Sequence, residues 1–453
     1  MKNIVLILTF CAAVAVSAGT TVAVKSVSSD PSTGILTVSY SLSGDCAVVT
    51  LSAETNGIPV PDAAFRRVTG DVNKVVAADG GDCEIRWCPD DDFGNGVFAS
   101  GGFKAVVKAW PTNSPPDYLV LDLKNNAARY YTCTNVMPGC VTDYRYLTDN
   151  MVFRRIPAAG VVWRMGSPVG ENGRTASNEA TRYVKLEKDY YLAVFETTQC
   201  QARYLFGKET PLWKSYNYNI PACETNLLPY CRFSYNSLRG NPQNSTCAYA
   251  YWPVDGHKIT YTEGFGAARS KYSFEFDYPT EAQWEFACRA GEPAAFNNGC
   301  ELVSNPYEPQ LDDTAWHIGN SSNAFANCAF PKRPGLLRPN AFGLYDMLGN
   351  VWEYCLDCHA AITQNAADAL AVVEDPKGPE PDLSATYVFR TLRGGGFASK
   401  ASDCRSSSRL GIPMGWDASD NIYYNVGVIV EKVKKLYQGS MGVRVCMPAI
   451  AVK

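Results

Sequence analysis

Residues 340–354 read Asn340-Ala-Phe-Gly-Leu-Tyr-Asp346-Met-Leu-Gly-Asn350-Val-Trp-Glu353-Tyr. This segment is aromatic and rich in glycine, and its apolar residues recur with neither the period of a helix nor that of a strand. The same irregular texture begins at about Met151 and continues through most of the chain that follows. It predicts a loop-rich fold that disulfides and bound ions, rather than long regular elements, hold together.

Two helices are nevertheless expected within this irregular region. Thr198 is followed three residues later by Gln201, and Thr280 by Gln283, which is the spacing of a capping box. Trp284 and the residues that follow it at helical spacing share one face, as a core-facing helix requires. The glycines expected to end the two helices are Gly207 and Gly291.

The chain before this region has a different pattern, that of a small all-β module over residues 19–126. In residues 36–42 and again in 49–53, apolar and polar residues alternate with the period of a half-buried strand. Further strand-like runs at 103–110 and 118–123 are separated by turn residues. These strands favour an Ig-like β-sandwich. Residues 127–150, which include Cys133 and Cys140, are interpreted as a connector.

The first 18 residues have the pattern of a secretory signal peptide. A lysine precedes an apolar run from Ile4 to Val16 that is too short to span a bilayer, and small residues end at Ala18. The alternative is a single anchoring helix. Cleavage after Ala18 removes Cys11, so that 16 of the 17 cysteines remain, an even number that permits complete pairing. We therefore expect a secreted or periplasmic, disulfide-bonded protein without a membrane span after cleavage.

Composition excludes several classes of protein. Lysine and arginine total 41 against 45 acidic residues, a net charge of -4, which gives no reason to expect nucleic acid as a partner. Thirty-six glycines and 27 prolines exclude a coiled coil. The three histidines, His257, His317 and His359, are too far apart in the sequence to suggest a multi-histidine metal centre.

The opening segment is one of five that occur in a fixed order, and together they resemble the formylglycine-generating enzyme, or sulfatase-modifying factor, family. The resemblance covers about residues 150–448 and implies that residues 151–453 form an α+β fold related to the C-type lectins. The five segments, the last of them in two parts and closed by Met441-Gly-Val-Arg444, are Val161-Val-Trp-Arg-Met165-Gly-Ser-Pro-Val-Gly-Glu171, Tyr190-Tyr-Leu-Ala-Val-Phe-Glu196-Thr-Thr-Gln199, Tyr278-Pro-Thr-Glu-Ala-Gln-Trp284-Glu-Phe-Ala-Cys-Arg-Ala-Gly291, residues 340–354, and Leu392-Arg-Gly-Gly-Gly396-Phe with Cys404-Arg-Ser-Ser-Ser-Arg409.

The resemblance does not extend to the copper chemistry of the family. The enzyme oxidises a cysteine of sulfatases to formylglycine with copper held by two thiolates, and copper(I) prefers such soft ligands. The position of the first thiol holds Ser399 here, and Cys404 fills the second by spacing. A lone Cys404 cannot make a two-thiolate site. We therefore assign no catalytic residue, keep Cys404 and Ser399 as the candidates, and do not expect copper.

For metal ions, the resemblance implies a structural calcium site at Asp346, Gly349, Val351 and Glu353, through two side chains and two backbone carbonyls. Oxygen ligands on a tight turn suit calcium, which would rigidify the loop. The alternative is that Asp346 and Glu353 are ordinary loop carboxylates.

Cys355-Leu-Asp-Cys358-His359 has the pattern of covalent haem attachment. We do not expect haem, because no second axial ligand is evident, nor a thioredoxin-like redox pair, because no βαβ context surrounds the motif. A disulfide of Cys355, for instance with Cys404, is the preferred interpretation.

Arg393, Arg405 and Arg409 cluster near the cleft that the resemblance implies, where guanidinium groups could bind carboxylates or a peptide backbone. Trp416 is a further residue that could line this cleft. The alternative is that the arginines hold loops together through carbonyls and carboxylates.

Two functions remain open at the level of sequence. The first is an exported binding or structural module that presents loops to a protein, peptide or glycan. The second is an oxidoreductase that acts on a cysteine of an exported protein. The sequence does not predict the oligomeric state.

Overall fold

The computed structural model describes residues 16–17, 19–93, 102–208, 222–231, 233–240, 262–321, 330–362, 371–382, 384–385, 388–413 and 440–451. The chain divides into two compact units. One comprises Met1–Asp122, Ala127–Asp143 and Ala449–Lys453, and the other comprises Leu123–Asn126 and Tyr144–Pro448. Most of the expected signal peptide, residues 1–15 and 18, lies outside the described residues.

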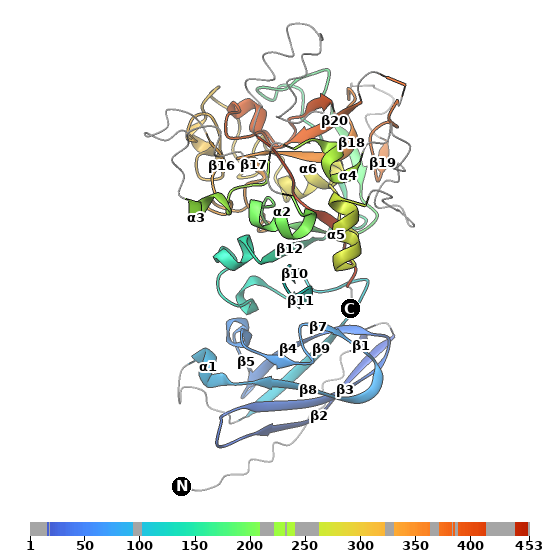
Figure 1. Ribbon diagram of the computed structural model, residues 1–453, viewed down its shortest axis with the longest axis vertical. Coiled ribbons are helices and arrows are strands. Elements are labelled where there is room, and N and C mark those ends of the chain that lie inside the picture. Colours follow the sequence, from blue (N-terminus) through green and yellow to red (C-terminus); the bar gives the residue numbers. More distant parts are fainter. Residues whose placement is uncertain are drawn as a thin grey trace. The chain divides into compact units, whose positions relative to one another are not determined.

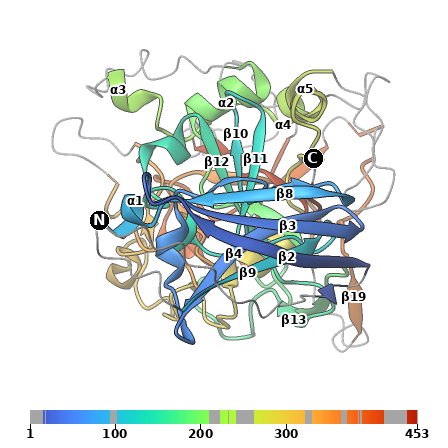
Figure 2. The ribbon, with the colours of Figure 1, turned by 90° about the horizontal axis from the view of Figure 1, so that it is seen from below.

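The N-terminal unit contains two antiparallel sheets (Figures 1 and 2). One has the order β1-β2-β3-β8-β6, and in the other β4 pairs with β5, β7 and β9. Strands β10 and β11 form an antiparallel pair. The strands are β1 (Val16–Ser17), β2 (Thr20–Ser29), β3 (Leu36–Gly44), β4 (Ala47–Thr55), β5 (Ile58–Pro59), β6 (Thr69–Gly70), β7 (Lys74–Val76), β8 (Asp79–Trp87), β9 (Phe103–Pro111), β10 (Tyr118–Asp122) and β11 (Ala127–Tyr131), with helix α1 (Pro89–Phe93) and 3₁₀ turns at Asp62–Phe65 and Thr134–Val136.

The core of this unit follows from the alternation seen in its sequence. Every second residue of β3, from Leu36 to Leu42, is buried, because successive side chains of a strand point to opposite faces. Trp87 of β8 lies 4.7 Å from the ring of Phe65 and 5.9 Å from that of Phe103 on β9. Because β8 and β9 belong to different sheets, these aromatic contacts join the two sheets across the core.

The C-terminal unit combines several small sheets with short helices (Figure 1). Strands β12, β15 and β23 pair in that order; the other sheets are β13-β14-β19, β16-β17 and β21-β20-β18-β22. The elements are β12 (Asn150–Ile156), β13 (Val162–Met165), β14 (Arg182–Lys185), β15 (Tyr190–Ala193), α2 (Gln199–Phe206), α3 (Ala222–Thr225), α4 (Tyr235–Arg239), α5 (Gly264–Tyr272), α6 (Glu281–Arg289), β16 (Ala315–Trp316), β17 (Leu348–Gly349), β18 (Trp352–Cys358), β19 (Val372–Glu374), β20 (Phe389–Arg393), β21 (Leu410–Pro413), β22 (Met441–Gly442) and β23 (Cys446–Pro448), with 3₁₀ turns at Tyr144–Leu147, Pro309–Leu311 and Ala401–Cys404.

Both predicted capping boxes are present. The side chains of Thr198 and Thr280 cap α2 and α6, and each glutamine three residues later reaches back to its threonine. Helix α2 ends at Gly207 as predicted. Helix α6 ends one residue earlier than predicted, because Ala290, with φ of 47°, takes the left-handed position before Gly291.

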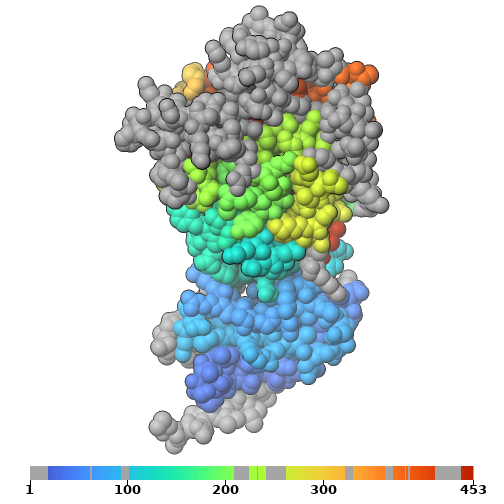
Figure 3. Space-filling view, in the orientation of Figure 1, coloured from blue at the N-terminus to red at the C-terminus, as the bar shows by residue number. Residues whose placement is uncertain are grey.

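The helices pack differently around the unit. Helices α2 and α5 contact each other, and their side chains form a continuous stretch of surface, green beside yellow in Figure 3. Helix α6 instead packs on the sheet strands β18 and β20, and its residue Trp284 is fully buried. This buried position brings the carboxylates of α6 into the interior of the unit.

No disulfide is present among the cysteines whose side chains the structure describes, so the prediction that disulfides pin the fold has no support there and stays a prediction for the remaining cysteines. Cys355 and Cys404, the suggested pair, both carry buried free thiols. Their surroundings differ: charges of Glu281 and Arg393 act on Cys355, whereas the backbone of Gly349 lies beside Cys404. Among the described residues, moreover, no helix has the length and apolar character needed to cross a membrane.

Candidate functional site

Ser399, which the resemblance noted above aligns with the first copper-binding thiol, is part of a tight turn that follows β20. Its side-chain oxygen accepts a hydrogen bond from the backbone N–H of Gly396 at 2.9 Å, and its own N–H donates to the carbonyl of Gly396. Only 4% of Ser399 is exposed. The hydroxyl therefore stabilises the local backbone, and it offers a hard oxygen where a copper(I) site needs sulfur.

Cys404, at the second position, is fully buried at the end of the turn Ala401–Cys404. Burial, assisted by the negative charge of Asp403, raises the pKa of its thiol well above the ordinary value. Gly395, with φ of 79°, leaves room for this sulfur, because a Cβ there would lie 2.6 Å from Sγ. Cys404 is thus a protonated, packed thiol rather than a reactive thiolate.

The haem-like motif lies in β18 and just after it. Cys355 and Cys358 are both buried in this strand, which pairs with β20 on one side and β22 on the other. Burial lowers the pKa of His359 to about 4, and its Nδ1 lies 3.2 Å from the hydroxyl of Thr391. Since neither sulfur is exposed, these residues do not fit covalent haem attachment.

Arg393 is the centre of a buried ion-pair network. Its Nη2 lies 2.5 Å from Glu285, and its Nε lies 2.9 Å from Glu281, both on α6. Its Nη1 donates to the carbonyls of Ser406 and Ser408 at 3.0 Å. No part of Arg393 is exposed, so the guanidinium holds a helix and a loop together.

Arg405 and Arg409 make similar contacts. Arg405 pairs with Glu171 at 2.6 Å and Glu179 at 2.9 Å. Arg409 binds both carboxylate oxygens of Glu281. The sequence left two roles open for these arginines, lining a cleft or holding loops together; in the structure, protein carboxylates and carbonyls pair with all three guanidinium groups. Trp416, the fourth residue assigned to the cleft, lies outside the described residues.

Of the predicted calcium ligands, Glu353 is held by protein donors. Arg444 donates from Nε to Oε1 at 2.9 Å, and Trp284 donates from Nε1 to Oε2 at 2.6 Å. Nη2 of Arg444 also lies 2.7 Å from Oε1 of Glu353, and Nη1 donates to the carbonyls of Ala193 and Val194 at 3.0 and 2.9 Å. Glu353 therefore anchors β18 to α6 and to the last strands of the unit.

Asp346 differs from Glu353, because one of its two carboxylate oxygens accepts no hydrogen bond in the described structure. Oδ2 accepts the N–H of Gly335 at 2.7 Å, whereas the buried Oδ1 has no hydrogen-bond partner. Burial raises the pKa of Asp346 to about 6. Gly349 follows with φ of 77°, where a Cβ would meet the carbonyl of Trp316 at 2.2 Å. Among the described residues, no three acidic, histidine or cysteine side chains converge on one point that could hold a metal.

Glu196 is a structural residue whose role was not predicted from the sequence. Its carboxylate accepts the N–H of Val351 at 3.0 Å and the side-chain N–H of Asn350 at 2.5 Å. It is fully buried, and burial together with the charges of Asp346 and Glu353 raises its pKa well above the ordinary value. The sequence does contain a signal for this role. Glu196 directly follows an apolar run, and a carboxylate buried at such a position needs hydrogen-bond donors around it.

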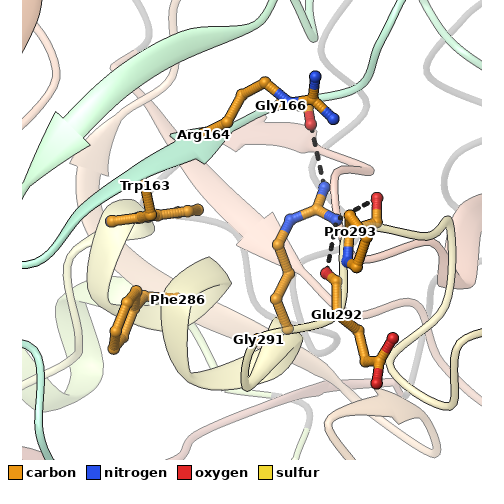
Figure 4. A pocket seen from close by; sticks show the side chains of 8 residues that line it. Trp163, Arg164, Gly166, Phe286, Gly291, Glu292 and Pro293 are labelled. Atoms are coloured by element: carbon orange, nitrogen blue, oxygen red, sulfur yellow. Dashed lines mark hydrogen bonds between the residues drawn. The ribbon is translucent and has the colours of Figure 1, made fainter.

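A pocket of about 250 Å³ lies between β13 and the end of α6 (Figure 4). Trp163 and Phe286 form its aromatic side, with ring centroids 5.5 Å apart. Arg289 forms the opposite side and is fixed by hydrogen bonds to the carbonyls of Gly166, Glu292 and Pro293. The arrangement offers space for an apolar group, since the carboxylate of Glu285, at 2.8 Å, and backbone carbonyls already pair with the guanidinium of Arg289.

Comparison with known proteins shows that most of the C-terminal unit is similar to a known protein family. A family model described as a sulfatase-modifying factor enzyme 1-like domain matches residues 158–424, more than half of the chain. A formylglycine-generating enzyme of Thermomonospora curvata is 34% identical over 140 residues, which cover 28% of this chain and 40% of that protein. The chain thus spans less than half the length of that relative.

Two further relatives match with lower identity. A protein named chaperone protein LppX, from Paenibacillus barcinonensis, is 25% identical over 256 residues, which cover 51% of this chain and 76% of that protein. Among solved structures, Treponema denticola variable protein 1 is 21% identical with a TM-score of 0.44; the match covers 66% of this chain and 95% of that chain.

The ion pairs of Arg393 lead to a prediction for stability. We expect Arg393→Met to lower the free energy of unfolding of the C-terminal unit by about 3–5 kcal/mol, because Glu281 and Glu285 lose a buried cation. Urea unfolding measures the change. Arg338→Gln is the matched control, since the side chain of Arg338 is 78% exposed, and it should change stability by less than about 0.5 kcal/mol. Equal losses in the two variants would show that the buried pair contributes nothing.

Asp357 leads to a prediction for pH dependence. Burial and the nearby charge of Glu281 raise its pKa to about 7 from an ordinary 3.8. Since the unfolded protein releases this proton at lower pH than the folded protein, Asp357 lowers stability as the pH rises from 4 to 7. Asp357→Asn should remove this contribution, so the variant gains stability relative to the parent as the pH rises. Thermal unfolding at pH 5 and pH 7 tests this, and a difference independent of pH would contradict it.

Proposed function

Because the chain belongs to the sulfatase-modifying factor enzyme 1-like domain family, we propose that it is a divergent member that binds a ligand and does not oxidise cysteine. The observation that carries this proposal is the state of the two positions where the family chemistry needs thiolates. Ser399 supplies a hydroxyl that is bonded to Gly396, and Cys404 supplies a buried thiol with a raised pKa. These residues do not fit a two-thiolate copper site.

The network of ion pairs supports a rigid scaffold as the role of the fold. Arg393, Arg405 and Arg409 connect α6 to loops around residues 171–179 and 405–409, and their partners are buried acids. A scaffold of this kind can hold surface loops in place for a ligand without contributing a reacting group. We propose that the ligand is an exported protein, a peptide or a glycan.

The location that we propose is the periplasm or the outside of the cell. The support is the basic start, apolar run and small residues of the first 18 positions.

A second candidate is oxidation of a cysteine in an exported protein. The relatives named formylglycine-generating enzyme favour it, since the matching segment of the first is 34% identical. It would require Cys404 to act without the thiol that Ser399 replaces.

We also propose that Asp346, Gly349, Val351 and Glu353 hold calcium. The support is the buried Oδ1 of Asp346, which has no partner in the described structure. A bound ion would satisfy this oxygen and stabilise the turn that leads into β18. Because Arg444 and Trp284 already donate to Glu353, Asp346 is the residue on which this proposal depends.

The copper-dependent reaction can be tested directly. We expect the protein, incubated with copper and a Cys-x-Pro-x-Arg peptide, to form no aldehyde detectable by mass spectrometry, because Cys404 alone cannot provide two thiolates. A known formylglycine-generating enzyme serves as the positive control for the assay. Copper-dependent aldehyde that disappears in Cys404→Ala would establish the second candidate function instead.

Calcium binding has its own test. We expect calcium to raise the unfolding temperature of the protein, since a ligand at 100-fold excess over its Kd stabilises the folded state by about 2.7 kcal/mol. Asp346→Ala should abolish the shift. Asp313→Asn, which alters an aspartate whose side chain is 52% exposed, should retain it. A shift of the same size in Asp346→Ala would place the ion elsewhere.

A further inference from the structure

A second hollow of the C-terminal unit has a volume of about 530 Å³ and contains none of the residues assigned above to copper, calcium or the arginine network. Three separate segments, residues 297–300, 309–314 and 338–341, contribute its lining. Unlike the pocket beside Trp163, it contains no aromatic residue. Its lining includes the polar side chains of Asn297, Cys300, Gln310, Asp313, Arg338 and Asn340.

Asn297 is the unusual residue of this hollow. It is only 7% exposed, and its side-chain oxygen Oδ1 is buried without a hydrogen-bond partner in the described part of the chain. Buried polar groups are normally paired, and an unpaired one lowers the stability of the folded state. A hydrogen-bond donor of a ligand in this hollow would satisfy the unpaired oxygen of Asn297 after a small rotation of its side chain.

The neighbouring carboxamides show that the loops do not need Asn297 for their own structure. Asn298 donates to the carbonyl of Gln310 at 2.8 Å and accepts from the N–H of Cys300 at 3.1 Å. Asn340 donates to the carbonyl of Ala287 at 2.7 Å and accepts from the N–H of Leu344 at 3.1 Å. Asn298 and Asn340 thus stabilise the backbone around the hollow through hydrogen bonds, whereas Oδ1 of Asn297 makes none.

The rim adds groups of both hydrogen-bonding types. Arg338 is a donor and Asp313 an acceptor; they form an ion pair at 3.4 Å with side chains 78% and 52% exposed. Exposed pairs of this kind are weak, so a ligand can replace either partner. Together with the amide of Asn297, the lining of the hollow therefore contains both hydrogen-bond donors and acceptors.

We propose that this hollow binds a hydroxyl-rich ligand, namely a sugar unit of a glycan; the inference rests on the proposed binding function. Each sugar hydroxyl both donates and accepts, which matches the mixed donors and acceptors of Asn297, Asp313 and Arg338. The apolar lining consists of Pro309, Pro339 and Ala341, which are small and suit the C–H faces of a sugar. A peptide would instead need a deep apolar pocket for an anchoring side chain.

Cys300 provides a direct readout of occupancy. It carries a free, partly exposed thiol and lines the hollow. The test measures its alkylation rate with iodoacetamide, by mass spectrometry, in the presence of cellobiose, maltose, mannobiose or N,N′-diacetylchitobiose. We expect at least one disaccharide to slow alkylation of Cys300 several-fold. Cys140, an exposed thiol of the N-terminal unit, is the internal control and should react at an unchanged rate.

Variants separate binding from folding. Asn297→Leu should lose the protection while its unfolding temperature stays equal or rises, because the change removes an unpaired buried amide. Arg338→Gln alters an exposed side chain and should weaken the protection without affecting folding. Arg86→Gln is its matched control, because Arg86 forms an exposed ion pair with Glu84 in the other unit. It should leave the protection intact.

The proposal is overturned if no disaccharide slows the reaction of Cys300, or if protection persists unchanged in Asn297→Leu and Arg338→Gln. Protection by tryptic peptides of casein in place of the sugars would also overturn it and assign the hollow to a peptide. These outcomes are distinct from failure of the proposed function. Copper-dependent aldehyde would overturn the binding function whatever the alkylation shows, whereas absence of both aldehyde and protection would overturn the sugar site alone.

Discussion

The C-terminal unit depends on the pairing of two buried carboxylates of α6 with arginines from distant parts of the chain. Glu281 and Glu285 are one helical turn apart and therefore lie on the same face. Arg393 contacts both, and Arg409 contacts Glu281. A buried carboxylate without a partner is costly, so arrangements of the helix, β20 and the following loop that separate these charges are disfavoured.

Arginine suits this fold because its short elements leave many backbone carbonyls without a regular ladder. One guanidinium carries five N–H groups and can bind a carboxylate and several carbonyls at once. Arg405 does so with Glu179 and the carbonyl of Gly173, and Arg409 with Glu281 and the carbonyls of Asn178 and Ala360. In the described structure, guanidinium groups thereby connect loops that have few backbone hydrogen bonds of their own.

This scaffold also explains how the family fold can persist without the family's thiolates. The turn around Ser399 is closed by hydrogen bonds with Gly396, and Cys404 fits against the glycine at 395. Both residues contribute to packing in the form they have. The sites that we propose for calcium and for a ligand use polar atoms that have no partner in the described structure, those of Asp346 and Asn297.

Local patterns of sequence were sufficient for some features. The alternation in residues 36–42 predicted β3, and the threonine–glutamine spacing predicted the starts of α2 and α6, because both effects act within a few residues. The end of α6 was missed by one residue, since Ala290 adopts a left-handed backbone that is uncommon for alanine. Pairing of cysteines could not be predicted from their number, because a count of thiols carries no information on the distances between them.

The sequence by itself determined the family, the two helix caps and the replacement of a thiol by Ser399, since each is a property of residue type and spacing. Only the tertiary structure decided which of two roles the arginines have and which buried amide is left without a partner. Arg393 could have lined a cleft or joined loops, and the outcome depended on Glu281 and Glu285 more than 100 residues away. Asn297, Asn298 and Asn340 are the same residue type, and only their neighbours in space distinguish the one whose carboxamide is unused.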